Sequence, residues 1–134
     1  MEAKKQTLEL DLRARPLWLF VGWTLVFSVI FLSLAPVSIN TGVEQGDKAL
    51  HGFAYSALML WFASLYGSLG RRWMLAAAFV AMGIALEFIQ GLTDYRSFEV
   101  ADMLADAVGV AAGWALAPPR LPNFLRLIER VFRS

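Results

Sequence analysis

Apolar residues are gathered into four long segments along the chain, and polar residues fill the short stretches between them. The segments cover residues 16–34, 49–66, 73–92 and 101–117. A helix needs about 20 residues, with a range of about 17–25, to cross the hydrocarbon core of a bilayer. The first segment exceeds the apolar stretch of about 7–15 residues found in a signal peptide, and Pro36 would directly follow its cleavage site. The pattern therefore predicts an all-α membrane protein with a bundle of four transmembrane helices.

The end of the chain has a different pattern. After three prolines, apolar residues recur at helical spacing and the arginines lie on other faces, which is typical of a basic amphipathic helix on a membrane surface. A simple anchor is the expected role, and recognition of a partner is the alternative. We thus expect a cytoplasmic arm at 1–15, a membrane domain at 16–117 and a cytoplasmic amphipathic tail at 118–134.

Composition agrees with a membrane protein. Of the 134 residues 58% are hydrophobic, and the mean hydropathy is +0.56, which is more than a soluble domain of this size usually carries. No basic stripe lies outside the segments next to the predicted spans, so a nucleic-acid partner is not expected. The chain has no cysteine, which excludes disulfides and thiol chemistry.

The positive charges predict an orientation. Ten of the 12 Lys and Arg residues lie in the first 15 residues, at 71–72 or after residue 117, and only Lys48 and Arg96 lie in the other two loops. Cytoplasmic loops of membrane proteins carry the excess of Lys and Arg. Both termini are therefore expected in the cytoplasm, and the loops at 35–48 and 93–100 are expected outside.

Asp106 is the most unusual residue in this pattern. The charge-free run that ends the fourth segment covers only residues 107–117, too short for a span, so the span must include Asp106. A carboxylate at that depth costs at least about 2.5–3.5 kcal/mol unless it faces protein or water and has a partner. Asp106 therefore predicts a functional site.

Three of the predicted helices bring polar residues to a similar depth. A helix rises about 1.5 Å per residue, and residues four apart share a face. On this basis the polar residues of the second, third and fourth spans all lie near the outer end of the bundle. The predicted site, with an arginine at its mouth, consists of His51, Tyr55, Glu87, Gln90, Arg96, Asp102 and Asp106.

Four of these residues also have a structural explanation, whereas Glu87 and Asp106 are harder to explain in this way because acidic residues are rare within spans. His51 could bond a backbone carbonyl, Tyr55 could be an interfacial aromatic residue, and Asp102 could cap the start of its helix. Arg96 suits an anionic head group or is a solvated loop charge. Gly109 and Gly113 lie at four-residue spacing, which predicts close helix packing within the chain or against a partner.

The residue types favour some kinds of chemistry over others. A catalytic metal is not expected, because the chain has a single histidine and no HExxH pair, and no cofactor motif is present. There is no GxSxG motif for a serine nucleophile. Acid-base chemistry by His51 with Glu87 or Asp106 is feasible, and so is hydrogen bonding to a head group without catalysis.

The order of these motifs resembles the VanZ-like family. The resemblance rests on DKALHGFAY at 47–55, EFIQ at 87–90, Arg96 and DMLADAVG at 102–109, and it covers about residues 36–117. It implies a small multi-pass protein of the bacterial cytoplasmic membrane, in a family named after an accessory factor for teicoplanin resistance. The family pattern commonly has asparagine at the position of Asp106, which leaves the charge and role of this residue open.

The function expected from these observations is recognition of an amphiphilic envelope ligand. A lipid-linked or lipid-tailed molecule would keep its tail in the bilayer and place its polar head in the outer pocket. One alternative is a membrane enzyme that acts on a lipid head group, with His51, Glu87 and Asp106 as catalytic candidates. A transport or assembly subunit, with a proton relay and a helix partner at Gly109 and Gly113, is another.

Overall fold

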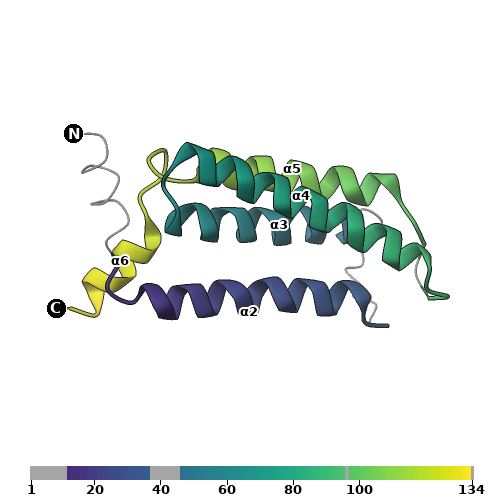
Figure 1. The fold of residues 1–134 in the computed structure, drawn as a ribbon, viewed down its shortest axis with the longest axis horizontal. Helices are drawn as coiled ribbons and strands as arrows, with labels where there is room; N and C mark the ends of the chain where they lie inside the picture. Colours follow the sequence, from purple (N-terminus) through teal and green to yellow (C-terminus); the bar gives the residue numbers. More distant parts are fainter. Residues whose placement is uncertain (1–11, 37–45, 96, 134) are drawn as a thin grey trace.

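The computed structural model describes residues 12–36, 46–95 and 97–133, and within these ranges it contains helices and no strands. The helices are α2 (Arg15–Leu34), α3 (Gly46–Leu65), α4 (Leu69–Gly91), α5 (Val100–Leu116) and α6 (Phe124–Val131). Helices α2 to α5 run along the long axis of the molecule with alternating directions, and the short α6 lies at one end (Figure 1). The prediction of an all-α fold is confirmed.

The helix bounds follow from local sequence signals. Pro16 lies in the first turn of α2, where its missing N–H costs no hydrogen bond. Helix α4 begins before the apolar run at residue 73 because the Ser68 hydroxyl accepts a hydrogen bond from the Arg71 N–H at 3.4 Å and caps the helix. Helix α3 begins at Gly46, so Lys48 lies in its first turn rather than in a loop.

Helices α3 and α5 form the most extensive contact in the bundle. Gly109 and Gly113 of α5 are buried where they face α3, directly over the backbone carbonyl groups of Gly52 and Ser56. A Cβ atom at either glycine would overlap the carbonyl oxygen that it faces. The two glycines therefore let the helix backbones of the same chain approach closely.

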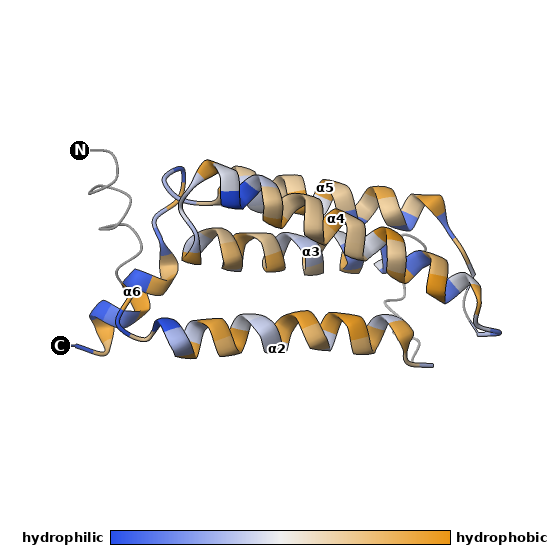
Figure 2. Cartoon of the chain, in the orientation of Figure 1, coloured by the Kyte–Doolittle hydropathy of each residue, from blue (hydrophilic) through white to orange (hydrophobic). Residues whose placement is uncertain are grey.

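Helix α2 is the outlying member of the bundle. Only Gly22 and Val26 are buried along it, whereas Phe20, Phe27 and Phe31 are each about two-thirds exposed. Apolar residues predominate along the middle of the long helices and polar residues gather toward their ends (Figure 2). By length and composition, α2 and α4 could each cross a membrane. The other two predicted spans are α3 and the shorter α5, and both carry charged residues in their first turns.

The last carbonyl groups of α3 are bonded by side chains from three other segments. Arg72 donates to Ala63 O at 2.8 Å and to Tyr66 O at 3.1 Å, Asn123 donates to Ser64 O at 2.9 Å, and Arg15 donates to Leu65 O at 2.8 Å. A helix end leaves four such carbonyls without intrahelical partners. These bonds join α2, α4 and the turn before α6 to the end of α3.

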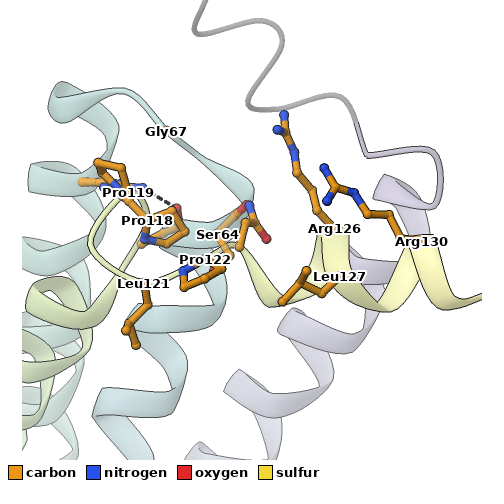
Figure 3. A pocket seen from close by; sticks show the side chains of 12 residues that line it. Ser64, Gly67, Pro118, Pro119, Leu121, Pro122, Arg126, Leu127 and Arg130 are labelled. Carbon is orange, nitrogen blue, oxygen red and sulfur yellow. Dashed lines mark hydrogen bonds between the residues drawn. The ribbon is translucent and has the colours of Figure 1, made fainter.

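A small cavity of about 260 Å³ lies beside this end, between the proline-rich turn after α5 and the first turns of α6. Figure 3 shows Pro118, Pro119 and Pro122 on its wall and the side chains of Arg126 and Arg130 projecting from α6. Arg72 also donates to Pro118 O at 2.6 Å, which holds the turn against the start of α4. The cavity is at the opposite end of the bundle from the predicted site.

Candidate functional site

The predicted site lies where the C-terminal ends of α2 and α4 meet the N-terminal ends of α3 and α5 (Figure 1). A cavity of about 700 Å³ opens here. This volume is within the range of about 300–1,000 Å³ that is common for small-molecule sites. The lining includes both apolar and polar residues. The lining residues are Val29, Leu32, Ser33, Pro36, Asp47, Leu50, His51, Phe53, Ala54, Tyr55, Gln90, Tyr95, Ser97, Glu99 and Asp102.

His51 of the cavity lining forms a pair with a buried carboxylate. His51 Nδ1 lies 2.9 Å from Asp106 Oδ1, and Asp106 is 3% exposed. An ionised carboxylate only accepts hydrogen bonds, so the proton of a neutral His51 lies on Nδ1 and its lone pair lies on Nε2. Gly83 of α4 packs against the carboxylate, and a Cβ atom there would lie 2.7 Å from Asp106 Oδ2. Asp106 thus orients the histidine.

Lys48 makes an ion-pair network beside this pair. Its Nζ lies 3.0 Å from Glu99 Oε2 and 3.7 Å from Asp102 Oδ1. Glu99 immediately precedes α5 and Asp102 is in its first turn, where the helix dipole favours a negative charge. The network joins the start of α3 to the start of α5 and places charges of both signs at the cavity.

Glu87 and Gln90 form hydrogen bonds with backbone groups of neighbouring segments. The buried Glu87 accepts a hydrogen bond from the Glu99 N–H at 2.6 Å, which holds the start of α5 against the end of α4. Gln90 donates to Ser33 O at 2.5 Å, and the Tyr95 hydroxyl donates to Leu34 O at 2.6 Å. These last two bonds satisfy carbonyls at the C-terminal end of α2 and tie this loosely packed helix to the site.

A sequence model of the VanZ/LLP1 family matches residues 8–125, which is most of the chain. The chain belongs to the VanZ/LLP1 family. The resemblance inferred from the motifs at 47–55, 87–90 and 102–109 is confirmed, and the match extends it into the N-terminal arm and the start of α6. No curated protein and no solved structure matches the chain.

The structure brings most of the predicted site residues of this VanZ/LLP1 protein to one end of the bundle. His51, Tyr55, Gln90 and Asp102 line the cavity, and Asp106 bonds to His51. Glu87 instead lies behind the wall and bonds to the backbone of Glu99. Arg96 lies outside the described residues.

Three charged residues at this end of the bundle were missed by sequence reasoning. Lys48 and Asp47 were treated as loop charges before the second span, but α3 begins at Gly46 and includes both. Glu99 lies in a short polar segment with no motif of its own, and only the fold places it against Lys48. The four-residue spacing between Asp47 and His51 was the available signal, because it puts the two side chains on one helix face.

Proposed function

We propose that this protein is a multi-pass protein of the bacterial cytoplasmic membrane that recognises an amphiphilic envelope ligand in its outer cavity. In this arrangement α2 to α5 cross the membrane and both termini lie in the cytoplasm. The apolar surface of the bundle supports a position in the membrane. The positive charges near the helix ends support this orientation. Membership of the VanZ/LLP1 family agrees with an envelope role.

The mixed apolar and polar lining of the cavity is the observation that carries the proposal. Val29 and Leu32 of α2 and Phe53 of α3 offer an apolar surface, whereas the polar wall includes His51 and Gln90. An aliphatic tail suits the first surface, and a head group with hydrogen-bonding oxygens suits the second. Ligands with both parts include lipid-linked and lipid-tailed molecules of the envelope.

A block of the cavity tests this proposal. Ala54→Phe adds a ring at the wall, and Ala57→Phe adds the same ring on an exposed face of α3 as a matched control. Each protein is purified in mild detergent from its own membranes, its thermal unfolding is recorded, and retained lipids are identified by mass spectrometry. We expect a defined lipid at near-stoichiometric amount with wild type and Ala57→Phe, and its loss with Ala54→Phe. Equal retention by a folded Ala54→Phe protein would contradict the proposal.

The hydrogen bond between His51 and Asp106 favours a second candidate function, acid-base catalysis on a lipid head group. A histidine whose Nδ1–H is held by a carboxylate can take a proton at Nε2, as a general base does. Incubation of the purified protein with extracted envelope lipids distinguishes the two functions. Multiple turnovers that are lost in His51→Gln would favour the enzyme, and a bound lipid recovered unchanged would favour recognition.

A further inference from the structure

Three potential metal ligands lie close together in the lining of the outer cavity. Asp47, His51 and Asp102 each place a ligand atom within 4.8 Å of the others, and all three residues line the cavity. Asp47 and His51 come from one face of α3, and Asp102 comes from the start of α5. We propose that these residues bind a divalent metal ion, with Zn²⁺ as the best fit. The inference does not depend on the envelope ligand proposed above, since it concerns the metal alone.

The carboxylate of Asp102 is an independent observation in favour of a ligand. Its side chain is only 8% exposed, yet within the described part of the chain no group donates a hydrogen bond to Oδ1. A buried carboxylate oxygen without a hydrogen bond costs free energy unless a positive charge compensates it. Lys48 Nζ lies 3.7 Å away and is closer to Glu99, so it compensates this oxygen only in part.

His51 has a carboxylate partner of the kind that metal-binding histidines usually have. A histidine that binds a metal usually donates its other ring N–H to a carboxylate, which sets the tautomer and the ring orientation. Asp106 is placed to accept this bond from Nδ1, which leaves Nε2 as the atom that can bind a metal. Because Gly83 packs tightly against the carboxylate, the pair is held by the fold before any ligand binds.

The donor set suits Zn²⁺. One imidazole and two carboxylates bind Zn²⁺ at bond lengths of about 2.0–2.2 Å, so neighbouring ligand atoms of a tetrahedral site lie about 3.3 Å apart. The present spacing of up to 4.8 Å would have to shorten to this value when the metal ion binds. Three protein ligands leave a fourth position for water or an oxygen of a bound molecule.

A substitution of Lys48 can distinguish a metal site from a simple ion-pair network. Its ammonium group lies beside Asp102 and competes with a metal ion for the same carboxylate. Lys48→Gln removes the competing charge and leaves all three proposed ligands in place. A metal site predicts tighter binding in this variant, whereas a purely structural network predicts no metal binding in any variant.

Zinc titration of the purified protein, with any affinity tag removed, tests the inference. His51 is the sole histidine and the chain has no cysteine, so few competing ligands are present. We expect one Zn²⁺ per chain by calorimetry or chelator competition, at least about tenfold weaker binding in Asp102→Asn and His51→Gln, and at least about fivefold tighter binding in Lys48→Gln. Asp94→Asn, which removes an exposed carboxylate from the turn after α4, is the control and should bind like wild type.

Two results would overturn the inference. One is Zn²⁺ binding that is equal in wild type, His51→Gln and Asp102→Asn. The other is no binding by either wild type or Lys48→Gln when thermal unfolding shows both proteins to be folded. Co²⁺ provides a second readout, because a tetrahedral site gives intense visible absorption that His51→Gln should remove.

Discussion

At the scale of single residues, Asp106 shows how this fold accommodates a carboxylate in a largely apolar helix. The side chain is buried and accepts a hydrogen bond from His51, and the absence of a side chain at Gly83 leaves room for it. Alanine at position 83 would crowd Asp106 Oδ2, whereas Gly70 of the same helix has no atom near its Cβ position. The site therefore depends on a glycine that carries no chemistry of its own.

Asp106→Asn tests which role the carboxylate has. The asparagine oxygen can still accept the hydrogen bond from His51 Nδ1, so the fold and ligand recognition should be retained. If Asp106 instead supports acid-base chemistry, activity should fall by about 10²-fold or more. Lipid retention and complementation of a deletion strain measure the outcome. A folded Asp106→Asn protein with no residual function would contradict recognition as the primary role.

At the scale of elements, the C-terminal end of α3 is held by an arginine that the sequence pattern alone does not distinguish from its neighbour. Arg71 and Arg72 are adjacent and alike in sequence, but Arg71 is exposed and Arg72 is buried. Arg72 donates hydrogen bonds to backbone oxygens of Ala63, Tyr66 and Pro118. One guanidinium group thereby connects the end of α3, the start of α4 and the turn after α5.

Arg72→Met should therefore destabilise the protein, and Arg71→Met provides the matched control. The first change leaves three backbone carbonyls without their donor, and one unsatisfied buried polar group costs about 1–3 kcal/mol. The second removes an exposed cation that lies 5.1 Å from the Tyr66 ring centre, an interaction that contributes about 0.5–1 kcal/mol at exposed sites. Thermal unfolding in detergent measures both. Equal effects of the two substitutions would show that the hydrogen bonds of Arg72 are not important for stability.

Glu129 connects α6 to α2 through hydrogen bonds that predict a pH dependence of the stability. Partial burial acts to raise the pKa of Glu129, but bonds from the N–H groups of Ala14, Trp18 and Arg13 lower it below its ordinary value of 4.5. Because the folded-state pKa is lowered, the ionised Glu129 stabilises the folded protein above pH 4.5. This stabilisation is lost as the pH falls through the folded-state pKa.

Glu129→Gln should lower the unfolding midpoint at pH 7, because one amide oxygen cannot replace a carboxylate that accepts three hydrogen bonds. The difference between the variant and wild type should shrink as the pH falls below 4.5, where the carboxylate of wild type becomes protonated. Thermal unfolding at several pH values measures this difference. A gap that stays constant down to pH 3 would indicate that the charge of Glu129 is not the cause.

At the scale of the whole molecule, the bundle has two chemically different ends. One end carries α6 and most of the arginines. Some of these arginines donate hydrogen bonds to helix carbonyls, and others lie on the C-terminal tail. The other carries the cavity, the pair of His51 and Asp106, and the network around Lys48. This polarity predicts that the arginine-rich end faces the cytoplasm and that the cavity opens on the outside.

Cysteine labelling in intact cells tests this orientation on a chain that has no native cysteine. Asp94→Cys and Ser97→Cys, between α4 and α5, should react with a membrane-impermeant thiol reagent. Gly70→Cys and Arg133→Cys should react only after the cells are permeabilised. The opposite pattern would invert the topology and place the cavity on the cytoplasmic side, which excludes recognition of an outer-leaflet ligand.

The helices and the family could be predicted from the sequence alone, because both depend on local order along the chain. The apolar periods predict α2 to α5 to within a few residues, and the spacing around His51, Glu87 and Asp106 indicates the VanZ/LLP1 family. Depth along each helix also predicts that polar residues gather at one end. These properties need only helix geometry and the order of residues.

The partners of each side chain were decided by the tertiary structure. Glu87 and Asp106 are both acidic residues within predicted spans. In the structure Glu87 accepts a hydrogen bond from the backbone before α5, whereas Asp106 orients His51. Likewise, only packing distinguishes the buried Arg72 from the exposed Arg71, and only the approach of α3 to α5 brings Asp102 to Lys48. Helical period and depth do not specify the rotation of each helix about its axis, and that rotation depends on close contacts such as Gly109 over the Gly52 carbonyl.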